Sequence, residues 1–379
     1  MLTRVRFGFI TYGLDRPAFG ISRSTLSLGR ALERRHGVEP VFLTPYRHGP
    51  FAETTDRHTH MTGARLAPGL MTIGALELPL LARREALPLI HDPTGMSPFL
   101  IGRRFAPYKR VVTLYDATPF LHPETHTLLD NVLHRMYVPA TLRNVDAVIT
   151  ISEIAKQDLL RFLRLRSSQI HVVHLAADPA FRPVAPQESA NILARYELKQ
   201  PFVLYLGALE PRKNVPTLVR AFARLRSEFP NLQLVLGGGQ RWSFGQIPQV
   251  IEQLGLTDSV RVTGYVPDAD LPGLYSAASV FCFISLSEGF GLPILEAMAC
   301  GAVVVCSNRS SMPEVAGQAA LLVDPTDVEG VASGLRRVLR DPDLANALRQ
   351  RGLARAARFS WELTAERTVD VYRAVLETA

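Results

Sequence analysis

The sequence predicts an α/β protein of two tandem, Rossmann-like, doubly wound domains that face each other across a cleft. Short apolar runs rich in Val, Ile, Leu and Phe alternate with segments of helical period, as expected of parallel strands covered by helices on both faces. The pattern breaks at residues 176–200 and then restarts, and a chain of 379 residues is long enough for two domains. We therefore expect one domain over residues 1–180 and a second over residues 200–359.

The first domain contains several apolar runs with strand character. They are Val5–Ile10, Val38–Leu43, Leu87–Ile90, Arg110–Tyr115, Ala147–Ile151 and Ile170–Val173. Helices are predicted at residues 22–35, 124–143 and 152–162. Ser22 and Ser152 each stand where a side chain can cap the start of a helix. Residues 45–69 have little periodicity and contain several Gly, Pro and His residues, which indicates a long loop.

The second domain repeats the alternation after a linker at residues 176–200. In that linker, Pro179, Pro183 and Pro186 are expected to interrupt any regular element. The predicted strands are Phe202–Leu206, Gln233–Leu236, Val260–Val262, Val280–Ile284, Val303–Cys306 and Ala320–Val323. The predicted helices are Val215–Phe229, Gln246–Leu254, Leu271–Ala277, Pro293–Ala299 and Val328–Arg340. Because ligands of such sheets bind beyond the carboxyl ends of the strands, loops that follow strands are the candidates for a site.

Composition excludes several classes of protein. An apolar fraction of 47% and a charged fraction of 20% suit a globular protein and not a collagen-like or wholly disordered one. No window of about 18 apolar residues predicts a membrane-spanning helix, and the N-terminal residues lack the apolar core of a signal peptide. Cys282, Cys300 and Cys306 lie in apolar segments and are expected to be buried free thiols in a reducing compartment.

The net charge is +7, from 42 Lys and Arg against 35 Asp and Glu, and the excess leans towards the first half of the chain. A solvated, Arg-rich surface explains this excess as well as an anion-binding surface does. The sequence has no zinc-ligand cysteine pair and no basic–aromatic repeat, so no nucleic-acid partner is expected. Phosphorylated substrates and an anionic membrane surface are the partners that the charge suits.

The most informative segment runs from Ser285 to Gly301. It follows an apolar strand, holds glycines in a loop, and continues into a helix that Gly301 can terminate. Amide groups at such a helix start favour anions, phosphates especially. Glu288 falls in the loop and Glu296 near the first turn, so one carboxylate could accept hydrogen bonds from sugar hydroxyls while the other holds a ribose. The structural alternative is a solvated loop glutamate and a second one that suits the helix dipole.

This segment strongly resembles the E-x(7)-E motif of the family 4 glycosyltransferases of GT-B fold. Glu288 and Glu296 are separated by seven residues, with Gly-Phe-Gly-Leu-Pro between them. The resemblance implies that Glu288 contacts the donor sugar and that Glu296 contacts the nucleotide ribose. It also implies that the loop with Phe290, Gly291 and Leu292 faces the donor's phosphates and sugar.

A second resemblance concerns the loop after the strand Phe202–Leu206. This loop contains the adjacent cations Arg212 and Lys213, followed by Asn214 and a helix. Alone, these residues would be an ordinary basic loop with a helix cap at Asn214. In the family, an Arg/Lys pair at this place binds the donor's diphosphate and stabilises the leaving nucleotide, which implies that role for Arg212 and Lys213.

Two glycine-containing segments of the second domain belong near the same site. Asp268-Ala269-Asp270 has the form of a metal-binding D-x-D, but Asp270 precedes a helix and is explained as its N-cap, so no metal is expected. In the family this stretch borders the donor base, which makes Tyr265 a donor-binding candidate. Gly237-Gly238-Gly239 lacks the spacing of a phosphate loop and is interpreted as a turn near the donor.

In the first domain, residues 13–23 resemble the family's glycine-containing first loop, which closes on the donor phosphates beside the acceptor. Gly20 permits close approach of the backbone. Arg23 is a candidate for contact with a phosphate or with an acidic group of the acceptor. A plain strand-to-helix loop is the alternative.

The segment that ends at Tyr115-Asp116 resembles a family strand that ends in His-Asp near the reacting centre. Tyr115 replaces the histidine, and a phenol cannot reproduce an imidazole near neutral pH. Tyr115 therefore either hydrogen-bonds the donor sugar or marks an altered site, while Asp116 is expected to orient the acceptor or the sugar. His91, at the end of another strand, is a further candidate for the cleft, with a structural role as the alternative.

The resemblance as a whole implies a retaining, metal-independent glycosyltransferase without a cofactor, with Arg212, Lys213, Glu288 and Asp116 as catalytic residues. It would move a hexose, with mannose favoured, from a GDP- or UDP-linked donor to a hydroxyl of a lipid-linked or polysaccharide acceptor. The second domain would hold the donor and the first the acceptor, and the last helix, in residues 360–379, would cross back to the first domain. The expected location is cytoplasmic and peripheral at the inner membrane surface.

Two other functions stay open at this point. A sugar-nucleotide epimerase or hydrolase on a similar fold would need carboxylates or histidines as acid and base. A non-catalytic partner that only binds a sugar nucleotide is suggested by Tyr115.

Overall fold

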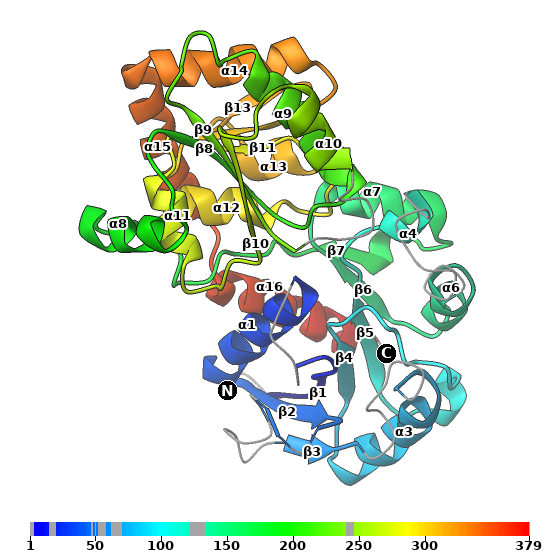
Figure 1. The fold of residues 1–379 in the computed structure, drawn as a ribbon. Coiled ribbons are helices and arrows are strands. Elements are labelled where there is room, and N and C mark those ends of the chain that lie inside the picture. The colour runs from blue at the N-terminus through cyan, green and yellow to red at the C-terminus, as the bar shows by residue number, and fades with distance from the viewer. Residues whose placement is uncertain are drawn as a thin grey trace. The chain divides into compact units, whose positions relative to one another are not determined.

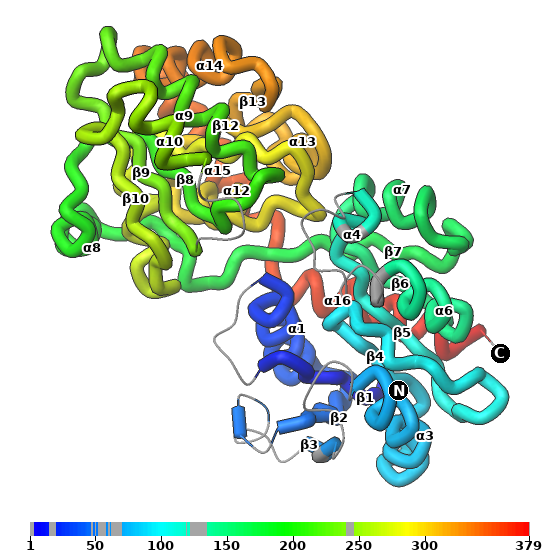
Figure 2. The backbone as a smooth tube through the Cα atoms, turned by 45° about the vertical axis from the view of Figure 1, so that its right-hand side comes forward, coloured from blue at the N-terminus to red at the C-terminus, as the bar shows by residue number. Residues whose placement is uncertain are grey.

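The computed structural model describes residues 4–14, 20–46, 48–49, 51, 58–61, 70–121, 133–239 and 246–378. The chain divides into two compact units. The first comprises Met1–Leu175 together with Ser360–Ala379, and the second is Ala176–Phe359. The colour ramp of Figure 2 makes this visible, because the red C-terminal helix lies among the blue-to-green elements of the first unit.

The first unit is built on a parallel sheet. Among the described residues its strand order is β3-β2-β1-β4-β5-β6-β7. The strands are β1 Val5–Ile10, β2 Val38–Thr44, β3 His58–His60, β4 Leu89–Asp92, β5 Lys109–Thr113, β6 Ala147–Thr150 and β7 Ile170–Val172. The order reverses between β1 and β4, which is the switch point of a doubly wound sheet. The predicted α/β class is confirmed here.

Helices cover both faces of the first sheet (Figure 1). On one face, α1 packs on α16, which also contacts β1, β5 and β6. On the other, residues of α3 and α6 join strand residues such as Ile90 and Val112 in one apolar core. The helical elements are α1 Ile21–Arg34, η1 Leu70–Gly74, α3 Ala75–Arg84, η2 Arg103–Phe105, α4 Thr118–Leu121, η4 Leu133–Tyr137, α6 Val138–Leu142, α7 Glu153–Phe162, η5 Ser167–Gln169 and α16 Trp361–Glu377.

The second unit is a second doubly wound domain. In its described part the parallel strands have the order β10-β9-β8-β11-β12-β13. The strands are β8 Phe202–Leu206, β9 Gln233–Gly237, β10 Val260–Gly264, β11 Val280–Phe283, β12 Val304–Ser307 and β13 Leu321–Val323. The helical elements are α8 Pro186–Arg195, η6 Pro211–Lys213, α9 Val215–Ala223, α10 Gln246–Gln253, α11 Leu271–Ala277, α12 Leu292–Ala299, α13 Met312–Ala316, α14 Val328–Arg340 and α15 Pro342–Ala356.

The apolar character of the strands follows from this two-sided cover. Every residue of β8 and of β11 is buried, because helices occupy both faces of the sheet and leave no solvated side. The aromatic rings of Tyr205 and Phe283 stack between these neighbouring strands, with centroids 6.2 Å apart. The central strands are thus fixed from both faces, and the loops at their carboxyl ends start from rigid points.

The linker prediction was wrong in one respect, because residues 186–195 form helix α8. Pro186 occupies the first helical position, where the missing N–H has no partner to lose and the fixed φ angle suits a helix. Ile192 and Leu193 are buried, and α8 packs on α11. A proline inside a helix can break it, but Pro186 stands at the first position of α8 and begins the helix.

Three expectations for the first unit need correction or lie outside the description. Helix α1 begins at Ile21 with Gly20 as its N-cap and no side-chain cap, so Ser22 does not cap it. The predicted loop 45–69 contains a short strand, β3, which pairs with β2 and is too short to show a period. Residues 124–132 of the predicted helix 124–143 lie outside the described residues, and η4 and α6 cover the rest. Ser152 caps α7 as predicted, accepting from the amide of Ala155.

No helix within the described ranges is long and apolar enough to cross a bilayer. Cys282, Cys300 and Cys306 are buried free thiols. Burial raises the pKa of Cys300 and of Cys306 to about 12, so both stay protonated at neutral pH. These thiols are packing residues.

Candidate functional site

Loops from adjacent strands meet at the carboxyl edge of the second sheet. Arg212 and Lys213 follow β8, Glu288 follows β11, and Ser310 follows β12. Because β8, β11 and β12 are parallel neighbours, their following loops leave the sheet side by side. The residues that the sequence singled out from separate loops are therefore brought together.

The two cations lie on a short 3₁₀ turn that ends in a left-handed residue. Pro211 begins the turn, and Asn214 after it has φ 59°, a conformation that Asn tolerates better than most residues. The Asn214 side chain does not cap α9, contrary to the sequence prediction. Its amide nitrogen donates to the carbonyl oxygen of Pro325 at 2.5 Å, and its oxygen accepts from the Thr217 hydroxyl at 2.7 Å. The Asn214 side chain thus anchors the turn that carries Arg212 and Lys213.

Both cations point at one carboxylate. Lys213 Nζ lies 2.5 Å from Glu288 Oε1, and Arg212 Nη1 lies 2.9 Å from Glu288 Oε2. The side chains of Lys213 and Glu288 are each 9% exposed, and that of Arg212 is 19% exposed. The sequence prediction that Arg212, Lys213 and Glu288 share a site agrees with this geometry, while their roles remain a prediction.

The charges of this cluster are fixed by their mutual contacts. Burial acts to raise the pKa of Glu288, but Lys213 and Arg212 outweigh it and hold that pKa at about 2. Burial lowers the pKa of Lys213, and the facing Glu288 opposes that change. Glu288 is therefore an anion across the physiological range and cannot serve as a general base that takes and returns a proton.

The backbone of the Glu288 loop is held by serines that sequence reasoning missed. Ser310 Oγ donates to the Glu288 carbonyl oxygen at 2.8 Å and accepts from the Glu288 amide at 3.1 Å. Ser311 Oγ bonds to the carbonyl oxygens of Glu288 and Phe290. No motif in the sequence marks these residues, because they act through a loop that follows a different strand.

Glu210 is a second missed residue. Its carboxylate lies 2.7 Å from Nε of Arg212, whose Nη1 also donates to the Ser287 carbonyl oxygen at 3.1 Å. The guanidinium is thereby held from two sides, with Glu210 at one edge and Glu288 at the other. The acidic residue two positions before Arg212 was the available signal, but the sequence alone does not say which way it points.

The loop and helix after Glu288 have the predicted form. Gly291 is the N-cap of α12 with φ 99°, and Gly301 follows the C-cap with φ 74°, both of which favour glycine. Leu292, half-buried, opens the helix. Glu296 lies one residue beyond the first turn, is 5% exposed, and accepts a hydrogen bond from the Tyr275 hydroxyl at 3.2 Å.

Phe290 differs from its prediction. Its side chain is 3% exposed and packs edge-on against Phe359 at 6.2 Å. The ring belongs to the apolar core, so only the backbone of Phe290 can face a donor.

The strand ends on the other side of β8 come very close. Gly207 donates its amide to the Gly237 carbonyl oxygen at 3.0 Å, and Leu209 donates to that of Gly239 at 3.1 Å. A Cβ atom placed on Gly238, which has φ 141°, would lie 1.9 Å from the Gly207 carbonyl oxygen. Gly238 is therefore required by the close approach of two backbones beyond the ends of β8 and β9, and it shapes the loop that leads to Arg212.

Tyr265 and Asp270 lie after β10 and before α11. Tyr265 is 54% exposed and follows Gly264. Asp270 is the N-cap residue of α11 by position but makes no side-chain cap, so that part of its prediction is wrong. Its carboxylate instead pairs with Arg195 at 2.6 Å and accepts from the Tyr196 hydroxyl at 2.7 Å, both from the α8 region.

In the first unit, Tyr115 and Asp116 follow β5 and are half-buried. The Tyr115 hydroxyl donates to the Pro93 carbonyl oxygen at 3.0 Å, and burial raises the pKa of this phenol. Asp116 Oδ1 accepts from the Thr118 amide at 2.9 Å. The Tyr115 hydroxyl therefore already has a partner within the first unit.

Gly20 and Arg23 lie at the start of α1. Gly20 is exposed with φ 48°, and an added Cβ would meet no atom within 4 Å. Arg23 is half-buried in the first turn. Asp15–Phe19 of the same predicted loop lie outside the described residues.

His91 is a correction to the predicted site. It is fully buried in β4, with Nδ1 2.7 Å from the Tyr372 hydroxyl and Nε2 2.8 Å from Thr113 Oγ1. Burial lowers its pKa to about 3. A neutral imidazole with both nitrogens in use inside the core cannot contact an acceptor, so the structural alternative is right.

This burial makes the first unit sensitive to acid. Below pH 6.5 the unfolded chain binds a proton at His91, whereas the folded protein binds one there only below about pH 3. The free energy of unfolding therefore falls as the pH falls from 6.5 towards 3. Between pH 6.5 and about pH 5 the loss from this group is about 2 kcal/mol. We expect His91→Gln to flatten the pH dependence of urea unfolding, followed by Trp361 fluorescence in a Trp242→Phe background. His36→Gln, at an exposed histidine, is the control, and equal slopes for both variants would contradict the assignment.

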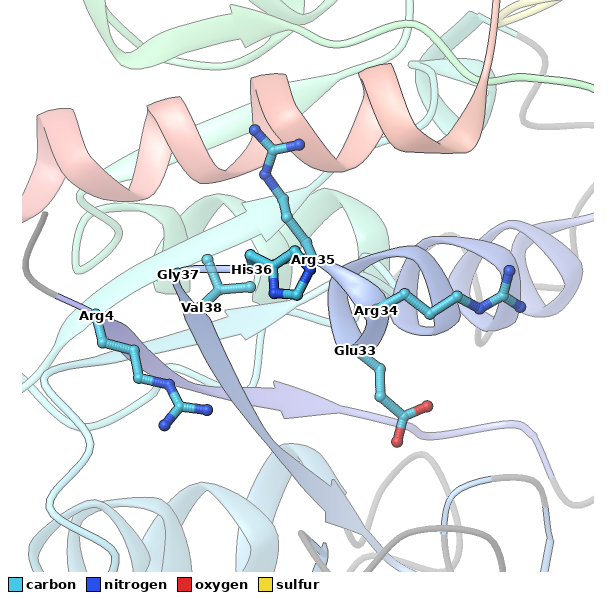
Figure 3. A pocket seen from close by; sticks show the side chains of 7 residues that line it. All are labelled: Arg4, Glu33, Arg34, Arg35, His36, Gly37 and Val38. Atoms are coloured by element: carbon cyan, nitrogen blue, oxygen red, sulfur yellow. The ribbon is translucent and has the colours of Figure 1, made fainter.

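A hollow of about 530 Å³ lies elsewhere in the first unit (Figure 3). Its lining residues are Arg4, Glu33, Arg34, Arg35, His36, Gly37 and Val38. They stand at the C-terminal end of α1 and before or at the start of β1 and β2, which is the amino edge of the strands. None of the predicted site residues lines it, so it is separate from the carboxyl-edge loops.

No group of three or more His, Cys, Asp or Glu side chains that could hold a metal ion occurs in the described part of the chain. The Asp268-Ala269-Asp270 segment accordingly contributes no such group.

Known proteins match the chain over most of its length. Glycosyltransferase Family 4 matches residues 19–181, and Glycosyl transferases group 1 matches residues 191–355. The chain is 33% identical over 393 residues to the O-antigen chain mannosyltransferase B of Escherichia coli, with 96% of this chain and 98% of that protein covered. It is 31% identical over 280 residues to the serotype-specific mannosyltransferase WbdA of Escherichia coli, covering 72% of this chain and 34% of WbdA.

The fold has close counterparts among solved structures. Sucrose-phosphate synthase from Thermosynechococcus elongatus superposes with a TM-score of 0.78 at 24% identity, over 99% of this chain and 100% of that chain. One family match covers most of each unit, and the first relative is matched over nearly its whole length. The chain belongs to the group 1, or family 4, glycosyltransferases, and it has their GT-B fold.

Proposed function

We propose that the protein is a retaining, metal-independent hexosyltransferase that moves mannose from a nucleotide diphosphate sugar to an acceptor hydroxyl in glycan or glycolipid synthesis. The observation that carries the proposal is the cluster of Arg212, Lys213 and Glu288 at the carboxyl edge of the second sheet. Mannose is favoured because relatives at 33% and 31% identity are named mannosyltransferases. The nucleotide is GDP or UDP, and the protein uses no cofactor.

The chemistry suits the charges of this cluster. When the bond between the anomeric carbon and the diphosphate breaks, negative charge grows on the leaving group and positive charge on the sugar ring. Arg212 and Lys213 supply fixed cations for the departing diphosphate, and the planar guanidinium fits phosphate oxygens in a bidentate manner. Glu288, ionised throughout, accepts hydrogen bonds from the sugar's hydroxyl groups.

We expect the configuration at the anomeric carbon to be retained, and we assign no side chain as the base that deprotonates the acceptor. The leaving phosphate oxygen takes the proton of the acceptor hydroxyl, so the acceptor attacks from the face that the diphosphate leaves. The fixed anionic state of Glu288 supports this assignment, since a carboxylate with a pKa of about 2 is a poor proton acceptor at neutral pH.

The remaining site residues divide between the two units. In the second unit, we assign Glu296 to the ribose, Tyr265 to the base, and the Gly291 and Leu292 amides to the donor's phosphates and sugar. Tyr265 is 54% exposed, and an exposed aromatic ring suits stacking on a base.

The first unit holds the acceptor, which we expect to be a lipid-linked or polysaccharide precursor. Gly20, Arg23 and Asp116 are its contact residues, with Asp116 orienting the acceptor or the sugar. Tyr115 contributes its hydroxyl oxygen, which can accept a hydrogen bond while its proton is donated to Pro93. The protein works in the cytoplasm, peripheral at the inner membrane surface.

A donor-binding screen tests this function. We expect GDP-mannose to raise the thermal midpoint, since a ligand at a hundredfold excess over Kd adds about 3 kcal/mol of stability. UDP-, ADP- and dTDP-sugars are the competitors, and EDTA should leave transfer unchanged. Arg212→Met should abolish the stabilisation. Arg336→Met is the control and should keep it, because Arg336 lies in α14 and pairs with Glu228.

Product analysis then separates the alternatives. Transfer with the donor's anomeric configuration retained supports the proposal, and inverted product contradicts it. Free sugar or an epimer formed without acceptor would point to the hydrolase or epimerase. Donor binding with no transfer to any of a panel of glycan and lipid-linked acceptors would point to a non-catalytic binding partner.

A further inference from the structure

Helix α3 presents an apolar face to solvent in the first unit. Ile73, Leu76 and Leu80, spaced i, i+3 and i+7 through η1 and α3, are 54%, 61% and 67% exposed. The opposite face, with Leu78 and Leu81, is buried in the core over the sheet. A contiguous aliphatic stripe on a helix that already has a buried face is typical of an interaction surface.

Two other segments of the same unit, η2 and η4, each expose a large apolar side chain. Phe105 in η2 is 69% exposed, and Met136 in η4 is 70% exposed. The η4 turn is tied to η1 by the Tyr137 hydroxyl, which donates to the Met71 carbonyl oxygen at 2.7 Å. Residues adjoining η2, α3 and α6 share one apolar core, so the exposed side chains belong to the outer surface of one helical layer. Figure 1 draws α3 and α6 on the side of the sheet away from α1 and α16.

Arginines accompany each exposed apolar group. They are Arg83 and Arg84 after Leu80, Arg103 and Arg104 before Phe105, and Arg135 before Met136. All five residues are exposed. Arg84 pairs with Glu85, and Arg103 with Asp146. Within the described residues, neither Arg83 nor Arg104 forms an ion pair.

We propose that this surface, the outer face of η1–α3 with η2 and η4, docks on an anionic lipid bilayer. Aliphatic, phenylalanine and methionine side chains would enter the acyl boundary while the arginines meet lipid phosphates at headgroup level. This is how amphipathic helices lie in a membrane interface. The positive rim favours a bilayer over a protein partner, because a negatively charged membrane complements it along all three segments. The inference rests on the proposed function insofar as a membrane surface is where a lipid-linked acceptor is found.

Vesicle co-sedimentation tests the surface with the whole protein. The probes are vesicles of phosphatidylcholine mixed with phosphatidylglycerol, and vesicles of phosphatidylcholine alone. We expect the parent protein to pellet with the mixed vesicles and not with the neutral ones. Leu76→Glu/Leu80→Glu should lower the bound fraction at least about tenfold, because two carboxylates would face the acyl boundary. Arg83→Gln/Arg104→Gln should lower it as well and reduce its dependence on salt.

A matched control uses exposed leucines of the second unit. Leu254→Glu/Leu322→Glu makes the same chemical change at side chains that are 41% and 39% exposed, and it should bind vesicles like the parent. Unchanged thermal midpoints and donor binding show that each variant is folded. Equal pelleting of the parent and Leu76→Glu/Leu80→Glu, or no pelleting of either, overturns the proposal. A dimer of the parent in sedimentation velocity that this variant loses overturns it in favour of a second copy.

This test is independent of the transferase assignment. Donor binding and hydrolysis of the donor in solution do not require a membrane, so vesicle binding can fail while those activities stay intact. Conversely, a protein that binds vesicles but no nucleotide sugar would keep the surface and lose the proposed function.

Discussion

The Lys213→Met variant should transfer sugar about a thousandfold more slowly than the parent, which is the loss expected when a fixed donor to a developing anion is removed. Methionine keeps the length and apolar stem of the side chain, and Arg212 continues to pair with Glu288. The fold should therefore survive while the departing diphosphate loses its buried cation. The measurement is the turnover number at saturating donor, together with donor affinity from thermal shifts.

Lys199→Met is the control for that result, because Lys199 is an exposed lysine of the same unit. It should leave turnover within about twofold of the parent, as surface substitutions away from a site do. If Lys213→Met kept full turnover and merely bound the donor more weakly, Lys213 would hold the ground state only. The assignment to the leaving group would then be wrong.

Replacing Gly238 by alanine should be the most damaging change of a single carbon atom in the second unit. The new Cβ would lie 1.9 Å from the Gly207 carbonyl oxygen at a φ of 141°, so the two backbones must separate. Strain of this kind costs about 3 kcal/mol or more. Because Gly207 opens the loop to Arg212 and Lys213, donor affinity should fall together with the free energy of unfolding in urea.

The neighbouring glycine gives the matched comparison. A Cβ on Gly239 would meet no atom within 4 Å, so Gly239→Ala should fold and bind donor like the parent. Similar unfolding curves for the two variants would show that the close approach of the Gly207 and Gly238 backbones can relax, and would contradict the prediction.

Most strands could be predicted because a strand that is covered on both faces is apolar at nearly every position. Val5–Ile10 and Phe202–Leu206 were placed to the residue, since nearly every position in these strands is apolar or small, with Arg6 the exception. Helix α8 was missed because a proline signals both a break and a first turn, and only packing on α11 decides between them. Strand β3 was missed because three residues show no period.

The site divides in the same way. Glu288, Arg212 and Lys213 could be found because both loops resemble motifs of the family, and the pairing of β8 with β11 then brings the two loops together. Glu210, Ser310 and Ser311 could not, because their roles depend on the direction of a side chain within a folded loop. His91 shows the opposite failure, since a histidine at the end of a strand looks the same whether it is buried or not.

The division of the chain has a consequence for the order of synthesis. The Tyr372 hydroxyl of α16 hydrogen-bonds His91, and its ring lies tilted against that of Phe7, with ring centroids 4.7 Å apart. The first unit therefore needs residues that are synthesised only after the whole second unit, Ala176–Phe359. Domains usually fold from the N-terminal end as they emerge, but here the half that begins first is completed last. Until α16 has been made, the side chains of Phe7 in β1 and His91 in β4 lack the partner that covers them in the folded unit.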